Sequence, residues 1–268
     1  MAHYSKTRPR FTTPCLIAVL VFLYAPLLVL MVNSFNASKY GGHWEGFSWQ
    51  WYEKLFKDEA TIQALLNTLQ IGACATVGAT ALGTLAAWCL HRYRSPVQRV
   101  HLVLTELPLA VPDIWIGVAM QLFFVSVHWE LGYGSVIAAH ITFCLCYVTA
   151  LMLGRLQSFD FQIVDAARDL GASNWQVAWR VVLPVLWPGI VASGLLAFIL
   201  SLDDFVITFF VSGPGAATLP SRVYSMAKTS RSLPVINALS TLLILGTFLI
   251  ALIGHRMLKP TAKPRSNL

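Results

Sequence analysis

The sequence predicts an all-α membrane protein with six transmembrane helices, and three features lead to this fold class. Hydrophobic residues make up 56% of the 268 residues and charged residues only 12%, about half the charged fraction of a soluble domain. The mean hydropathy is +0.64. Six apolar runs are long enough to cross a hydrocarbon core of about 30 Å, and they cover residues 14–32, 65–90, 102–127, 136–153, 189–211 and 236–253.

Positive charge predicts how the spans are oriented. Thirteen of the nineteen lysines and arginines lie before the first span or after the second, fourth and sixth: Lys6, Arg8, Arg10, Arg92, Arg94, Arg99, Arg155, Arg168, Arg180, Arg256, Lys259, Lys263 and Arg265. Cytoplasmic segments carry the excess of basic residues, so both termini are expected in the cytoplasm. The first span is too long for a secretory signal and lacks a small-residue cleavage site, so we expect a retained anchor.

Two connections are too long to be simple turns, and they divide the chain into three expected regions. Residues 1–60 hold the N-terminal tail, the first span and an outer segment. Residues 61–258 form a five-helix core with an inner helical hairpin at about 160–184, and residues 259–268 form a cytoplasmic tail.

The outer segment is rich in aromatic residues. They suit a short helix at the level of the lipid headgroups, and they are Trp44, Trp49, Trp51 and Tyr52. We expect this helix to be an interfacial anchor, and a docking surface for an external partner is the alternative.

The inner connection between the fourth and fifth spans predicts two short helices. One helix can run over residues 160–170 and end at Gly171. Ser173 or Asn174 can cap a second helix, which Pro184 is expected to interrupt. Two adjacent alanines leave one side of the first helix nearly flat, so another protein can approach closely. A surface hairpin without a partner fits the periodicity equally well.

The stretch DAARDLGASNWQVAWRVVLP resembles the cytoplasmic signature of the permease subunits of binding-protein-dependent ATP-binding-cassette importers. That signature reads Glu-Ala-Ala, three residues, glycine, nine residues and Ile-x-Leu-Pro. The corresponding positions here are Asp165, Ala166, Ala167, Gly171, Val181, Leu183 and Pro184. Asp165 replaces the glutamate and Val181 the isoleucine, and both replacements are chemically conservative.

The resemblance covers nearly the whole chain and is most specific for the polyamine branch, and within it for the second permease subunit of putrescine importers. The segments that carry it are NTLQIGACATVGATALGTLAAW, LPLAVPDIWIG and SLDDFVITFFVSGPGAATLP. It implies a type I importer permease fold in the bacterial inner membrane. It also implies that the chain is a transporter subunit and not an enzyme.

The same resemblance implies a set of partners. They are a second, similar permease, two ATPase subunits and a periplasmic polyamine-binding protein, which makes most of the choice among polyamines. The hairpin around Gly171 is expected to sit in a groove of the ATPase as a pair of coupling helices. The chain has no GxxxxGK[ST] loop, so ATP and Mg²⁺ are expected on the partner ATPase.

Two adjacent aspartates interrupt the fifth span in the stretch SLDDF. Each costs roughly 2.5–3.5 kcal/mol at the centre of a lone membrane helix, so a functional role is expected. On a helix, Asp204 shares a small, polar stripe with Ser193, Ala197, Ser201 and Thr208. We expect Asp204 to face a water-filled path, or else to stabilise a helix break or a subunit contact. Asp203 points to another side, where it can border that path or reach the partner subunit.

The third span carries a comparable stripe, which contains Glu106, Asp113, Gly117 and Gln121. Pro108 and Pro112 distort this span. No lysine or arginine lies deep in a span to pair with the carboxylates, so a cationic cargo such as a diamine is the expected counter-ion. Trp115 and Phe205 are candidate aromatic faces for it, and Glu106 can instead sit at the cytoplasmic interface. The predicted substrate path comprises Asp113, Trp115, Ser201, Asp203, Asp204, Phe205 and Thr208.

Small residues recur every four positions along the second span. One ridge is Thr68, Gly72, Thr76, Thr80 and Thr84, and the other is Ala75, Ala79, Gly83 and Ala87. Such ridges allow close helix packing with threonine hydrogen bonds between helices, so we expect a packing face.

The cysteines and histidines predict no metal site. The histidines, His140 among them, lack metal-ligand spacing and are expected at interfaces or in the core. The cysteines fall in apolar runs as packing residues, and they are Cys15, Cys74, Cys89, Cys144 and Cys146. The net charge of +7 reflects where the basic residues lie along a membrane protein, so nucleic-acid binding is not expected.

Two other classes of protein compete with the importer. An intramembrane aspartyl protease needs two aspartates from different helices, and Asp113 and Asp203 formally qualify, but the local motifs of such proteases are absent. A self-sufficient secondary transporter or channel is the other alternative. Neither class has a use for the inner helical hairpin.

Overall fold

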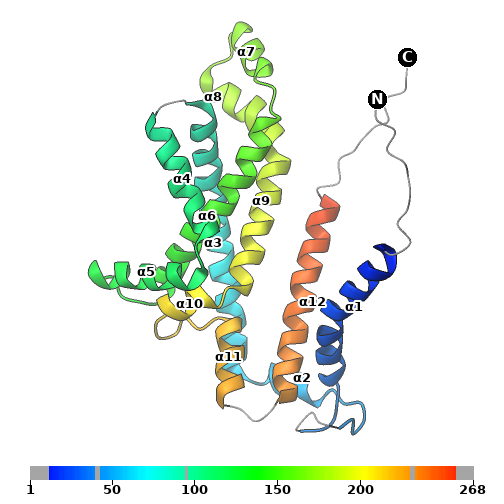
Figure 1. Cartoon of the computed structure of the whole chain (residues 1–268). Coiled ribbons are helices and arrows are strands. Elements are labelled where there is room, and N and C mark those ends of the chain that lie inside the picture. The colour runs from blue at the N-terminus through cyan, green and yellow to red at the C-terminus, as the bar shows by residue number, and fades with distance from the viewer. Residues whose placement is uncertain (1–11, 40–42, 94–95, 230–232, 258–268) are drawn as a thin grey trace. The chain divides into compact units, whose positions relative to one another are not determined.

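The computed structural model describes residues 12–39, 43–93, 96–229 and 233–257, and the regular elements in these ranges are all helices (Figure 1). The all-α prediction is therefore confirmed. The chain divides into two compact units, of which the first is Met1–Glu59 with Val223–Leu245 and the second is Ala60–Arg222 with Gly246–Leu268.

The first unit contains α1 (Thr12–Asn33), α2 (Gln50–Phe56) and the first part of α12 (Leu233–Met257). No residue of α1 is buried, and a helix that is apolar all round suits a bilayer. The short aromatic helix expected in the outer segment is present as α2.

The outer aromatic residues divide into two groups. Trp51 and Tyr52 are buried, and their polar atoms have partners. Trp51 Nε1 donates to the Asn36 carbonyl at 2.7 Å, and the Tyr52 hydroxyl lies 2.7 Å from Ser34 Oγ. Trp44 and Trp49 precede α2 and are 55% and 56% exposed. Only the second pair is therefore available to a lipid surface or a partner.

The second unit holds the remaining helices. They are α3 (Glu59–Arg92), α4 (Pro96–Ala110), α5 (Asp113–Ser126), α6 (Tyr133–Gln157), α7 (Gln162–Asp169), α8 (Asn174–Val177), the π-helix η1 (Ala178–Val182), α9 (Leu183–Asp203) and α10 (Val206–Val211), and α11 (Leu219–Thr229) runs across the boundary between the units. Among the described residues, five helices are long and apolar enough to cross a membrane, and the number is six if α4 and α5 together form one bent span.

The third predicted span is not a straight helix. It bends by 115° between α4 and α5, so the expectation of one distorted helix over residues 102–127 is wrong in this respect. Val111 precedes a proline and therefore disfavours helical geometry, and Pro112 itself is extended, with φ −58° and ψ 137°. Figure 1 shows α5 turned across the direction of α4 and lying beside α10.

The fifth span, expected over residues 189–211, begins earlier in the chain and ends earlier than expected. Residues Asn174–Asp203 form one span of 30 residues, so Pro184 does not interrupt the helix. Proline cannot donate to the carbonyl four residues before it. The π-helical turn η1 lies immediately before α9 and accommodates this loss within a continuous helix. The helix then stops at Asp203 instead of running to Val211.

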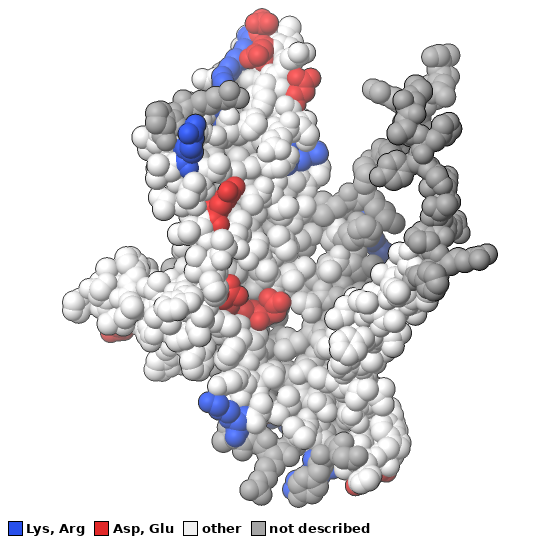
Figure 2. Space-filling view, viewed as in Figure 1, with Lys and Arg blue, Asp and Glu red and all other residues white. Residues whose placement is uncertain are grey.

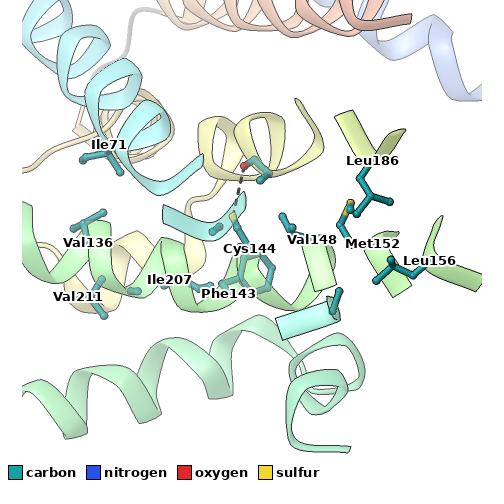
Figure 3. Close-up of a cluster of buried hydrophobic side chains, with 14 of the residues drawn as sticks. Ile71, Val136, Phe143, Cys144, Val148, Met152, Leu156, Leu186, Ile207 and Val211 are labelled. Carbon is teal, nitrogen blue, oxygen red and sulfur yellow. Dashed lines mark hydrogen bonds between the residues drawn. The ribbon is translucent and has the colours of Figure 1, made fainter. Parts of the chain in front are cut away.

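The core of the second unit is built around α6. Its buried side chains recur at helical spacing and include Val136, Phe143, Val148, Met152 and Leu156 (Figure 3). The helix packs against α9, α4 and α10. Cys144 also lies in this core, with its Sγ donating to the Ala197 carbonyl at 3.5 Å, as expected of a packing cysteine.

Helix α3 is the packing helix that its small residues predict. A Cβ added at Gly72 would lie 3.1 Å from the Phe198 ring of α9, and Ala75, Ala79 and Ala87 are fully buried. The expected threonine hydrogen bonds are found only in part. The Thr68 hydroxyl accepts from the Leu219 backbone amide at 2.8 Å. The buried hydroxyls that have no partner among the described residues are those of Thr76, Thr80 and Thr84.

We expect Gly83→Ala to destabilise the protein by about 1–3 kcal/mol, because a Cβ at this position would lie 2.7 Å from Val148 Cγ1 and 2.8 Å from Val148 Cβ. Gly154→Ala is the matched control, since nothing lies within 4 Å of its added Cβ, and alanine favours a helix by about 1 kcal/mol over glycine. Thermal unfolding in detergent measures both. Equal unfolding temperatures for the two variants would contradict the packing of α3 on α6.

Candidate functional site

The span that ends at Asp203 is broken at the next residue, and Asp204 stabilises the break. Asp204 has extended geometry with φ −64° and ψ 123°. Its Oδ1 accepts from the Ile207 amide at 3.3 Å, and its Oδ2 accepts from the Thr208 amide at 2.8 Å and the Thr208 hydroxyl at 2.9 Å. The carboxylate therefore caps the first turn of α10, where amide groups lack helical partners.

His140 of α6 is the second partner of this carboxylate. Its Nε2 lies 3.2 Å from Asp204 Oδ2 and 2.9 Å from Thr208 Oγ1, and its Nδ1 lies 2.7 Å from Ser201 Oγ. The side chains of His140 and Asp204 are only 1% and 8% exposed. A buried carboxylate needs hydrogen bonds or a partner of opposite charge, and Asp204 finds them within the unit.

These contacts correct part of the sequence interpretation. His140 lies in the core, one of the two places expected for the histidines, and its link to Asp204 was not predicted. A role for Asp204 in stabilising a helix break was one of the alternatives, and its contacts with α10 and His140 agree with that alternative. Ser201 and Thr208 are also buried, and they lie inside the helix packing instead of along an open surface. Whether cargo reaches them stays a prediction, and so does a path role for Asp204.

Asp203 and Asp113 differ from Asp204. Asp203 is the last residue of α9, Asp113 is the first residue of α5, and both are exposed. Neither forms an ion pair with another residue in the described part of the chain. Figure 2 shows acidic side chains at the level of α5 and α10, and no described lysine or arginine is drawn beside them on that face.

The fold brings the predicted path carboxylates together. Asp203 and Asp204 lie at the end of α9 and Asp113 at the start of α5, and both of these helices contact α6, while α5 also packs along α10. Gly117 permits this arrangement, since an added Cβ would lie 2.8 Å from the Phe210 ring of α10. The start of α5 and the broken end of α9 therefore belong to helices that pack against the same helix, α6.

The other predicted path residues lie in different surroundings. Trp115 is 67% exposed on the first turn of α5. Phe205 is half-buried, and its ring lies 5.6 Å from that of Phe209. Glu106 lines a separate open hollow with Arg99, formed by residues of α3, α4 and α6.

The inner hairpin has the expected turn and cap. Gly171 has a φ of +82°, a geometry that side chains with a Cβ rarely adopt. Ser173 caps α8, since its Oγ accepts from the Gln176 amide at 3.3 Å and its own amide donates to the Gln176 side chain at 2.8 Å. Helix α7 begins at Gln162, two residues later than expected, and ends at Asp169.

The hairpin exposes large apolar side chains at its outer surface. Leu170 is 89% exposed and Trp175 is 71% exposed, while Val164 and Val177 are buried and attach the hairpin to the unit. Figure 1 shows α7 and α8 at one end of the second unit, beyond the ends of α6 and α9. The signature residues divide between α7, the glycine turn, η1 and the start of α9.

Comparison with known proteins defines the class of this chain. Residues 79–259 match the family described as "Binding-protein-dependent transport system inner membrane component". The chain therefore belongs to this family of multi-pass inner membrane components.

Named relatives are similar over most of their length. The spermidine/putrescine transport system permease protein PotC of Haemophilus influenzae is 39% identical over 237 residues, which is 88% of this chain and 92% of the relative. The putrescine transport system permease protein PotI of Escherichia coli is 39% identical over 251 residues, which is 91% of this chain and 89% of that relative.

Solved structures support the fold. A bacterial ABC transporter involved in the import of the acidic polysaccharide alginate contains a chain that matches with a TM-score of 0.73 at 17% identity, covering 93% of this chain and 94% of the other. A chain of the MetNI methionine ABC transporter matches with a TM-score of 0.64, covering 77% of this chain and 100% of the other. The predicted importer permease fold is confirmed.

We expect Asp204→Ala to destabilise the protein by about 2–4 kcal/mol, because it removes the cap of α10 and the carboxylate partner of the buried His140 ring. Asp203→Ala is the matched control, and as an exposed substitution it should change stability by less than about 0.5 kcal/mol. Thermal unfolding in detergent compares them. Equal losses of stability in the two variants would contradict a structural role that is specific to Asp204.

Proposed function

We propose that this chain is a permease subunit of an ATP-driven importer of polyamines such as putrescine and spermidine. The observation that carries the proposal is the pair of exposed carboxylates, Asp113 and Asp203, which have no cationic partner in the described part of the chain and lie on two helices that both contact α6. The names of the relatives point to the same cargo.

The chemistry of these carboxylates suits a diamine. An ammonium group that leaves water needs a charge-assisted hydrogen bond or an aromatic face. Asp113 and Asp203 come from different spans, so they can meet the two ends of one cation. Trp115 follows Asp113 on α5, and Phe205 follows Asp203 across the helix break, so each carboxylate has an aromatic ring close by in the sequence.

The remaining parts of the proposed importer are a second, homologous permease, two ATPase subunits and a periplasmic polyamine-binding protein. The ATPase subunits would bind ATP and Mg²⁺ and would receive the hairpin of α7 and α8. Both termini of this chain would lie in the cytoplasm, in keeping with its basic residues.

The continuous helix suggests how ATPase motion reaches the cargo. Residues Asn174–Asp203 form one helical span of 30 residues, which corresponds to about 45 Å at about 1.5 Å per residue. Leu170 and Trp175 lie at the hairpin end of this helix, and Asp203 is its last residue at the other end. Movement of the hairpin would therefore move Asp203, and the path would open alternately to each side.

We expect vesicles with the complete importer to accumulate putrescine only when ATP and the binding protein are present. In this assay Asp113→Asn and Asp203→Asn should each lower uptake efficiency about tenfold, the equivalent of about 1.4 kcal/mol, since each removes one charge-assisted contact. Glu53→Gln on α2 is the charge-matched control and should leave uptake unchanged.

Two results would contradict this proposal. Unchanged putrescine uptake in both aspartate variants would remove the direct role of the carboxylates. Accumulation of putrescine by this chain alone, without ATP, would identify a secondary transporter instead.

We expect Leu170→Asp to prevent co-purification of the ATPase, because it places a charge on the most exposed apolar side chain of the hairpin. Ser158→Asp is the matched control, since it adds the same charge at an exposed residue outside α7 and α8. Affinity purification of the complete importer measures the ATPase recovered with each variant. Full recovery with Leu170→Asp would exclude this residue from the contact.

A further inference from the structure

His140 connects the two sides of the α9–α10 break. Ser201 lies in the last turn of α9, Asp204 is the break itself, and Thr208 lies in the first turns of α10. One imidazole ring from α6 lies within hydrogen-bond distance of all three side chains. The angle between α9 and α10 is therefore held by a residue of a third helix.

The hydrogen-bond pattern assigns a role to each ring nitrogen. The Thr208 hydroxyl donates its one hydrogen to Asp204 Oδ2, so towards His140 this oxygen can only accept. Nε2 must then carry the hydrogen that is shared between Thr208 Oγ1 and Asp204 Oδ2. Nδ1 shares its hydrogen bond with Ser201 Oγ. Both ring nitrogens and the three side chains around them therefore have partners.

This cluster decides which of the two adjacent aspartates is free. The Asp204 carboxylate is held inside by His140, Thr208 and the amides of α10, so the backbone presents Asp203 on the exposed side. Without the Nε2 donor, Asp204 loses its bond to α6. The break then loses the side-chain contact that ties Asp204 to a third helix, and the position of the adjacent Asp203 is held less firmly.

We propose that His140 is a positioning residue of the cation path, which fixes the helix break and thereby the place at which Asp203 meets the cargo. The effect of His140 on the cargo depends on the proposed function, polyamine transport. The structural half of the role, the placement of Asp203, can be tested without transport.

Two substitutions separate the two ring nitrogens. The amide nitrogen of His140→Gln reaches about as far as Nε2 and keeps a donor for Asp204, while the Ser201 hydroxyl can turn to its own helix backbone. The side-chain oxygen of His140→Asn reaches only about as far as Nδ1, so it keeps the acceptor for Ser201 and loses the donor for Asp204. Thr142→Val is the control on the same helix, because Thr142 is exposed and its hydroxyl donates to the Ala138 carbonyl of its own helix.

The first measurement is putrescine uptake by vesicles with the complete importer. His140→Asn should raise the KM at least tenfold while the maximal rate per assembled importer stays within threefold. His140→Gln and Thr142→Val should stay within threefold of the parent in both constants. A merely structural role would instead lower the amount of assembled importer and leave the KM unchanged.

The second measurement follows the position of residue 203 without any polyamine. Asp203→Cys is introduced into the full chain with the five native cysteines replaced by alanine, and a cationic methanethiosulfonate reagent modifies it in membrane vesicles. We expect His140→Asn to slow the modification at least fivefold, and His140→Gln to leave the rate within twofold.

The outcomes separate the two proposals. An unchanged KM or an unchanged modification rate in His140→Asn overturns the positioning role, and so does a His140→Gln variant that behaves like His140→Asn. If the parent importer carries no putrescine, the proposed function fails, and the modification rates alone then decide whether His140 places residue 203.

Discussion

A carboxylate at the depth of a bilayer costs several kcal/mol unless hydrogen bonds satisfy it, and Asp204 meets this constraint inside its own unit. It accepts from the first amides of α10 and from Thr208, and it lies beside the His140 ring. The amides become available only because the backbone leaves the helical conformation at this residue. The break, the turn of α10 onto α5 and the exposure of Asp203 all depend on this one satisfied charge.

Local sequence patterns were sufficient to predict α6 and the hairpin. The apolar run at residues 136–153 lies within α6, and Ser173 with Gln176 forms a capping box because both partners lie within one turn of chain. The long span that continues past Pro184 was not predicted. A proline marks a lost hydrogen bond, but whether the helix stops or widens into a π turn depends on what packs around it.

The sequence was sufficient to predict which carboxylates belong to the candidate site, but not which of them is buried and which are exposed. Asp113, Asp203 and Asp204 look alike in a hydropathy profile, and a helical projection even placed Asp204 on the stripe expected to be open. Which carboxylate is buried depends on His140, a residue far away in the sequence whose direction no local pattern reveals. The 115° bend after Val111 has the same origin, since prolines predict a distortion but packing sets its angle.

The π turn at Ala178–Val182 has a geometric consequence for the hairpin. Such a turn holds one residue more than an α turn, so the side chains before it are rotated by about 100° relative to an uninterrupted helix. The direction in which the Trp175 side chain points around the helix axis therefore depends on the number of residues in this short segment. Related permeases with an insertion or deletion there would present the hairpin to a different side of the same membrane helix.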